Sequence, residues 1–184
     1  LGHRLGTCFA SERYGIVPDM ITFAKGVTNA AVPMSGVLVR KGIYEAHMSG
    51  PEHLVELFHG YTYSGHPLAV AAGLATLDVY KNEGLFERAR ALEKPFADAM
   101  LSLKGLPHVA DIRPIGLIAG IDLNPIEGKP GLRGYNAIES MYHDHDLYVR
   151  VTMDTLIVAP PLIVSEPQIG EIRDRIAKVL KAVA

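Results

Sequence analysis

Lys25 has the residue type and the position that covalent amine chemistry requires. It follows the apolar run of residues 20–24 and leads directly into a turn at Gly26. A lysine buried at the end of a strand, near another cation, loses its charge more easily than a solvated lysine and becomes nucleophilic. Such an amine can condense with an aldehyde cofactor as a Schiff base. Because most lysines are solvated, the position alone also fits an ordinary surface residue.

Two further side chains could bind anions. Thr62 stands a few residues before a helix that we expect to begin at Pro67, where free N–H groups and the helix dipole favour a phosphate. The ordinary alternative is a loop threonine that caps a turn. Arg150 lies in an otherwise apolar expected strand, and its planar guanidinium matches a carboxylate. Its alternative is a strand-edge arginine that faces water or pairs with Asp154.

Other residues of reactive types have simpler interpretations. The run of residues 143–146 alternates histidine and aspartate, but neighbours two apart on a helix do not face each other, so we expect a solvated helix end and no metal. His66 is expected to have a structural role, and Cys8 has no adjacent partner that would make it a nucleophile. The glycines at residues 2–6 do not follow a dinucleotide-binding pattern.

The elements that must position Lys25 lie in the first half of the chain. Residues 20–24 and 35–40 are short apolar runs and are expected to be buried strands, joined by a loop over residues 28–34. Residues 42–56 are expected to form a short helix and a loop. A long helix should begin near Pro67 and stop before Gly84; it is apolar on nearly every face, which predicts burial on several sides.

In the second half, apolar residues recur at helical spacing from Leu85 to Leu103, and Pro95 predicts a kink or a break in that helix. The last helix should begin at Ser165, whose spacing to Gln168 matches a capping box. The other expected elements are strands at residues 109–113, 117–123, 148–151 and 155–159 and a helix at residues 135–145. The pattern predicts the end of an α/β domain at residues 1–82 and a small α+β domain at residues 83–184.

Composition excludes several classes of partner. The chain has 184 residues, of which 48% are hydrophobic and 21% charged, with a formal net charge of −2. This balance argues against nucleic acid as the main partner. No apolar run approaches the roughly 20 residues that span a bilayer. A single cysteine, Cys8, fits a reducing compartment, and we expect the cytoplasm.

The motifs together resemble one family. Residues 19–26, Asp-Met-Ile-Thr-Phe-Ala-Lys-Gly, are similar to the cofactor-lysine region of class III aminotransferases, which are pyridoxal-phosphate enzymes of fold type I. Residues 2–7 resemble the glycine-rich loop that precedes this region, and residues 60–67 resemble the phosphate-side loop. Residues 148–151 and 159–162 also fit. Several motifs in the right order cover essentially the whole chain, which therefore resembles the C-terminal part of such an enzyme.

Within the class, residues 25–36 are most similar to ω-amino acid:pyruvate transaminases of the β-alanine–pyruvate type. Ornithine-type relatives show a run of glycines soon after the lysine, and this sequence does not. The resemblance implies transfer of an amino group from an ω-amino acid or amine to pyruvate. The alternatives are another class III activity, of the 4-aminobutyrate or ornithine type, and a folded fragment that serves only as an interaction domain.

The resemblance also implies roles for three residues. Lys25 would hold pyridoxal 5′-phosphate as a Schiff base and then move a proton between the substrate and the cofactor. Thr62 would bind the cofactor phosphate across the interface of a homodimer or dimer of dimers, and Arg150 would receive the substrate carboxylate. Family members are more than twice as long, and the aspartate that pairs with the pyridine nitrogen lies upstream of residue 2. We therefore expect the 184-residue piece alone to be inactive.

Overall fold

A computed structural model describes residues 2–54, 57 and 61–183 of the chain, which form two compact units. The N-terminal unit comprises residues 7–84 together with Gly2, and the C-terminal unit comprises residues 85–183 together with residues 3–6. The expected boundary between residues 82 and 83 concerns the domains of a longer enzyme and stays a prediction.

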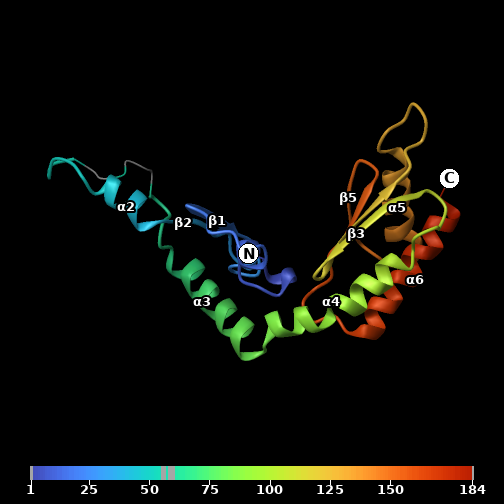
Figure 1. Ribbon diagram of the computed structural model, residues 1–184, viewed down its shortest axis with the longest axis horizontal. Coiled ribbons are helices and arrows are strands. Elements are labelled where there is room, and N and C mark those ends of the chain that lie inside the picture. Colours follow the sequence, from blue (N-terminus) through green and yellow to red (C-terminus); the bar gives the residue numbers. More distant parts are fainter. Residues whose placement is uncertain (1, 55–56, 58–60, 184) are drawn as a thin grey trace. The chain divides into compact units, whose positions relative to one another are not determined.

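The N-terminal unit contains a two-stranded antiparallel sheet and a long helix (Figure 1). Its elements are α1 (Ala10–Arg13), β1 (Met20–Ala24), β2 (Ser35–Val39), α2 (Lys41–His47) and α3 (Pro67–Asn82). Met20 pairs with Val39 at one end of the sheet, and an Arg40–Asp19 ion pair of 2.8 Å closes that end. The expected strands and the loop between them are therefore confirmed, with β2 one residue shorter than predicted.

The predicted burial of the two strands is wrong. The side chains of both strands are exposed or at most half-buried, and Val37 and Leu38 are more than half exposed. A sheet of two strands cannot cover its own faces. Within this unit α3 packs against the loop that joins the strands, through Gly73 and Tyr80, and so gives the strand faces little cover.

The long helix α3 begins and ends where its proline and glycine signals predict, at Pro67 and just before Gly84. Its predicted burial on several sides is wrong, because Ala69, Gly73 and Tyr80 are its buried residues. Leucines on the other faces stay 45–62% exposed: Leu68, Leu74 and Leu77. Of the helix and loop expected at residues 42–56, α2 is present, and residues 55 and 56 lie outside the described part.

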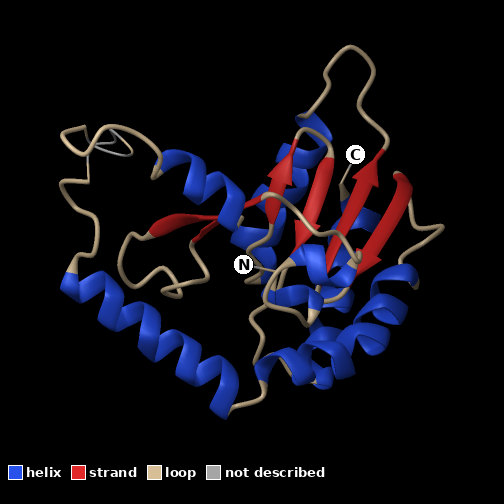
Figure 2. Cartoon of the chain, turned by 60° about the vertical axis from the view of Figure 1, so that its left-hand side comes forward, coloured by secondary structure: helices blue, strands red, loops and turns tan. Residues whose placement is uncertain are grey.

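The C-terminal unit is built on a four-stranded antiparallel sheet of order β3-β4-β6-β5 (Figure 2). Its elements are η1 (His3–Leu5), α4 (Leu85–Leu101), β3 (Val109–Ile115), β4 (Ile118–Leu123), α5 (Leu132–His145), β5 (Arg150–Thr152), β6 (Thr155–Val158) and α6 (Glu166–Ala182). Helix α4 packs against β3 and α6, and α5 packs against β5, β6 and α6. Large side chains between the layers are fully buried: Phe96, Met100, Ile121, Leu156 and Ile176.

The sheet of this unit is amphipathic. Along β4 buried residues alternate with half-buried ones, as expected for an antiparallel sheet with one packed face. Arg113 donates to Asp111 at 2.5 Å and to Asp122 at 2.6 and 2.9 Å, and Thr155 donates to Asp122 at 2.8 Å. Asp111 and Asp122 lie opposite each other, and the positive charge of Arg113, which donates to both, offsets the repulsion between the two carboxylates. Its hydrogen bond lowers the pKa of Asp122.

Of the kink or break predicted at Pro95, the break is wrong, because α4 is continuous from Leu85 to Leu101. A proline removes one backbone hydrogen bond, and burial of Leu92, Phe96 and Met100 on the same face outweighs that loss. The capping box of α6 is confirmed: Gln168 Oε1 accepts from the Ser165 N–H at 2.9 Å. The strands and α5 differ from their predicted bounds by one to three residues.

Within the described residues, no helix is long and apolar enough to span a bilayer.

Candidate functional site

Lys25 is the first residue after β1, as the sequence predicts, but it is exposed, so its predicted burial is wrong. The faces of β1 lack cover, and Lys25, which directly follows this strand, is exposed for the same reason. Its backbone has φ = 58°, a left-handed conformation that is uncommon outside glycine. Asn29 and Ala30 in the same turn have φ of 49° and 59°. Such a cluster of left-handed residues persists only where the surroundings hold it.

Hydrogen bonds within the turn hold this backbone. The Lys25 carbonyl accepts from the N–H groups of Thr28 at 3.2 Å and Ala30 at 3.1 Å. Thr28 is 1% exposed, and its hydroxyl donates to the Val32 carbonyl at 2.6 Å. The lysine is therefore exposed at its amine and anchored at its backbone.

Helix α3 anchors the same turn from outside. The hydroxyl of Tyr80, a residue that is 7% exposed, donates to the Gly26 carbonyl at 2.7 Å. A Cβ at Gly73 would lie 3.5 Å from Met34 Sδ and 3.7 Å from the Val27 carbonyl, which are ordinary van der Waals distances, so helix and loop lie next to each other at this position. Sequence reasoning missed this function of Tyr80. The signal was available, since residues 69, 73 and 80 fall on one face of the helix.

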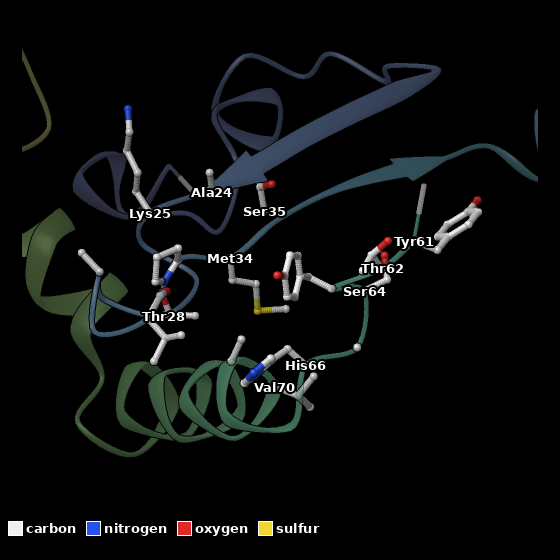
Figure 3. Close-up of a pocket in the computed structure, with 16 residues that line it drawn as sticks. Ala24, Lys25, Thr28, Met34, Ser35, Tyr61, Thr62, Ser64, His66 and Val70 are labelled. Carbon is white, nitrogen blue, oxygen red and sulfur yellow. The ribbon is translucent and has the colours of Figure 1, made fainter. Parts of the chain in front are cut away.

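A cavity of about 990 Å³ lies between this turn and the start of α3. Lys25 and Thr62 both line it, together with Ser35, Ser64 and His66. Figure 3 shows that the Lys25 side chain extends away from Thr62 and His66, while Thr62 and Ser64 lie on the segment that leads into the helix. The structure thus brings Lys25 and Thr62 to one cavity but directs the lysine amine out of it.

The end of the cavity beside Thr62 suits an anion. Thr62 and Ser64 supply hydroxyl groups a few residues before the N-terminus of α3, whose first N–H groups lack partners within the helix. His66 is the exposed N-cap residue and makes no capping hydrogen bond through its side chain. Part of the phosphate-side motif, Gly60, lies outside the described residues.

Arg150 is the first residue of β5, an edge strand of the C-terminal unit, and it is exposed. Within the described part of the chain its side chain makes no hydrogen bond or ion pair. The alternative pairing with Asp154 is wrong: that carboxylate accepts from the backbone N–H groups of Gly131 and Gly134. The other alternative, a strand-edge arginine that faces water, describes Arg150 in this structure, and its guanidinium is open to a ligand.

The remaining reactive residue types have simple environments. Burial raises the pKa of the Cys8 thiol, and the charge of Glu12 adds to that shift. His143 lies 3.7 Å from Glu139 on an exposed turn of α5. Among the residues that the structure describes, no group of three or more histidine, cysteine, aspartate or glutamate side chains could hold a metal ion.

The chain resembles known proteins over nearly its whole length. The profile of the family described as aminotransferase class-III matches residues 2–180. An omega-aminotransferase of Caulobacter vibrioides is 49% identical over 177 residues, which are 96% of this chain and 40% of that relative. A beta-alanine–pyruvate aminotransferase of Pseudomonas aeruginosa is 38% identical over 98% of this chain and 41% of its own length. The chain thus spans about two fifths of the length of these relatives.

Solved structures agree with the sequence comparisons. The crystal structure of a thermostable (S)-enantioselective omega-transaminase from Thermomicrobium roseum superposes with a TM-score of 0.88 at 31% identity, over 98% of this chain and 41% of that one. Fold type I is thereby confirmed, as is the resemblance to the C-terminal part of longer transaminases. The chain belongs to the class III aminotransferase family, whose members are pyridoxal-phosphate-dependent enzymes.

Proposed function

We propose that this chain supplies the cofactor lysine and the carboxylate-binding arginine of a transaminase that moves an amino group from an ω-amino acid or amine, such as β-alanine, to pyruvate. The observation that carries the proposal is Lys25, an exposed amine on a backbone held from inside its turn and from α3. The similarity to an omega-aminotransferase and a beta-alanine–pyruvate aminotransferase supports the choice of substrates.

The residues present fit pyridoxal 5′-phosphate. Lys25 Nζ has no side-chain partner among the described residues, so it is available to condense with an aldehyde. When bound, this cofactor supplies a ring that withdraws electrons from the substrate carbon. Lys25, once released by the amino donor, is the group that would take a proton from that carbon and deliver it to the cofactor carbon that carried the aldehyde. The anchored backbone keeps the amine within reach for both transfers.

Thr62 is proposed to donate its hydroxyl to the cofactor phosphate of the other subunit in a homodimer or dimer of dimers. The divergence of Lys25 and Thr62 around the cavity supports this assignment, since a lysine and a threonine of one chain that serve different cofactors need not converge (Figure 3). The N-terminus of α3 beside Thr62 adds N–H groups and a favourable dipole for the phosphate.

Arg150 is proposed to bind the carboxylate of pyruvate and of amino-acid donors. Its guanidinium offers two parallel N–H groups and has no competing partner in the described residues. The 184-residue chain alone is proposed to be inactive, because the resemblance assigns the aspartate partner of the pyridine nitrogen to the part of the relatives that this chain does not match. A location in the cytoplasm likewise stays a proposal.

The experiment that tests the central proposal is trapping of the lysine. Adding pyridoxal phosphate to the full-length enzyme should produce an absorbance band near the edge of the visible range, and borohydride followed by peptide mapping should place the label on Lys25. Lys25→Ala should abolish both signals, whereas the matched control Lys41→Ala, an exposed lysine of the same unit, should retain them. A label on another residue, or none, contradicts the proposal.

Mixed dimers test the role of Thr62. If Thr62 serves the partner subunit, a dimer of one Lys25→Ala chain and one Thr62→Ala chain contains one intact site and one doubly altered site. Such mixtures should then recover activity at limiting cofactor that neither variant has alone. No recovery would place Thr62 in the site of its own chain.

A panel of donors tests the substrate class. Turnover with β-alanine and pyruvate should exceed turnover with 4-aminobutyrate or ornithine and 2-oxoglutarate. The reverse order would assign the enzyme to the alternative class III activities.

A further inference from the structure

The two-residue turn between β5 and β6 is tied to helix α5. Thr152 pairs with Thr155, so Met153 and Asp154 form the turn, and Met153 has the uncommon φ of 53°. The Asp154 carboxylate accepts from the Gly131 N–H at 2.6 Å through Oδ2 and from the Gly134 N–H at 3.0 Å through Oδ1. A single carboxylate thus binds the N-terminus of α5, where the helix dipole favours a negative charge.

Close packing surrounds this carboxylate. A Cβ at Gly134 would lie 2.1 Å from the Met153 carbonyl oxygen and 2.8 Å from Val151 Cγ2, so a glycine is needed where the helix touches the hairpin. The Asp154 carbonyl also accepts from the Leu123 N–H at 2.8 Å, which ties the end of β4 to the same turn. The turn is held to α5 and to β4 through one residue.

Arg150 depends on this turn for its position. It lies in an edge strand of three residues and pairs with Ile157, on the far side of the Met153–Asp154 turn. Its exposed side chain has no partner in the described part of the chain that could fix it. The backbone of the short hairpin therefore sets the place of the guanidinium. The ladder between β6 and β4 holds one strand of the hairpin, and Asp154 holds its turn against α5.

We propose that Asp154 is a positioning residue for carboxylate recognition: by clamping the β5–β6 turn to the N-terminus of α5, it places Arg150 where a substrate carboxylate binds. The inference rests on the proposed function of Arg150. It assigns Asp154 an effect on carboxylate substrates and none on the chemistry of the amine.

The test separates the two half-reactions of the full-length holoenzyme. Single-turnover kinetics are measured with 1-phenylethylamine, a donor without a carboxylate, and then with pyruvate as acceptor. Asp154→Asn replaces one of the two acceptor oxygens by an NH₂ group, which should raise the apparent KM for pyruvate about tenfold, since a displacement near 1 Å can cost up to about a hundredfold. The rate with 1-phenylethylamine should change less than twofold. The matched control Asp144→Asn makes the same charge change on the exposed surface of α5 and should alter neither half-reaction.

Arg150→Ala distinguishes failure of this inference from failure of the proposed function. If Arg150→Ala shows the pyruvate-specific defect and Asp154→Asn shows none, or lowers both half-reactions equally, the positioning role is wrong. If Arg150→Ala itself shows no such defect, the carboxylate role of Arg150 is wrong and the inference falls with it. The double variant should be no worse toward pyruvate than Arg150→Ala alone, because both changes remove one interaction.

A second variant decides the case if Asp154→Asn yields no folded holoenzyme. Asp154→Glu keeps the charge and moves the acceptor oxygens by one methylene, so it should give the same pyruvate-specific rise in KM. Equal losses in both half-reactions for Asp154→Glu would overturn the proposal.

Discussion

The two units of the chain differ in how much of their apolar surface their own residues cover. In the C-terminal unit a sheet and three helices enclose side chains such as Phe96 and Ile176, which are fully buried. In the N-terminal unit, among the described residues, the buried hydrophobic side chains are Val27, Ala69 and Tyr80. The residue proposed to react, Lys25, thus belongs to the thinly covered unit, and the residue proposed to recognise substrate, Arg150, belongs to the well-packed one.

The comparison shows that an apolar pattern and burial are separate properties. Leu38 in β2 and Leu156 in β6 both lie in apolar strands, yet Leu38 is 51% exposed and Leu156 is fully buried. The difference is the presence of α5 against β6, whereas Gly73 and Tyr80 of α3 contact the loop that follows β1. In the N-terminal unit, the backbone at Lys25 is therefore held by a few hydrogen bonds and not by a hydrophobic core.

The largest effect should follow from removing a core side chain of the C-terminal unit. Phe96→Ala deletes a fully buried ring between the helices and the sheet, which should lower the free energy of unfolding of this unit by about 3–5 kcal/mol. Hydrogen exchange measured by mass spectrometry should show the loss in peptides of α4, α6 and the sheet. Equal loss of protection in α3 would show that the two units unfold together and would break the comparison.

A smaller effect should follow from loosening the Lys25 turn. Tyr80→Phe leaves the Gly26 carbonyl without its donor, at a cost of about 1–2 kcal/mol in local opening. Hydrogen exchange at residues 26–34 should become faster while the C-terminal unit stays unchanged. Tyr44→Phe, which removes an exposed hydroxyl in α2, is the control and should change nothing. Unchanged exchange in Tyr80→Phe would mean that the loop is held by packing alone.

The C-terminal unit should lose stability on mild acidification through His3. Burial, together with the charge of Arg4, lowers the pKa of His3 from 6.5 to about 4. Between these values the unfolded chain binds the extra proton and the folded chain does not, so stability falls as the pH falls from about 6.5 towards 4. Because His3 is partly exposed, we expect a loss of about 1 kcal/mol. Denaturant midpoints at pH 7.5 and 5 should show it, and His3→Gln should remove the slope.

The smallest effect should come from the exposed face of α3. Leu74 is 60% exposed, so Leu74→Ser should change the free energy of unfolding by less than about 0.5 kcal/mol. The matched change Leu117→Ser, at a fully buried position of the C-terminal unit, should be severe. If Leu74→Ser costs more than about 2 kcal/mol, that face of α3 is covered in solution and the contrast between the units is smaller than the structure shows.

Local signals in the sequence predicted the elements well, and long-range packing accounts for the errors. Pro67 and Gly84 bound α3, and Gln168 caps α6, because each acts on its own backbone within a few residues. Pro95 did not break α4, since the buried face of that helix holds it together across the missing hydrogen bond. The spacing of residues 69, 73 and 80 could have indicated that Tyr80 is buried, but not its partner, Gly26, which is far away in the sequence.

Sequence alone determined the family and singled out the residues that are proposed to react, because motifs such as residues 19–26 are read without any contact between distant segments. Only the tertiary structure decided that Lys25 is exposed on an anchored turn and that its side chain extends away from Thr62. It also decided that the Asp154 carboxylate binds the N-terminus of α5 and does not pair with Arg150. Burial and hydrogen-bond partners depend on which surfaces meet. A side chain's chemistry is carried by its own atoms, whereas its surroundings are supplied by residues elsewhere in the chain.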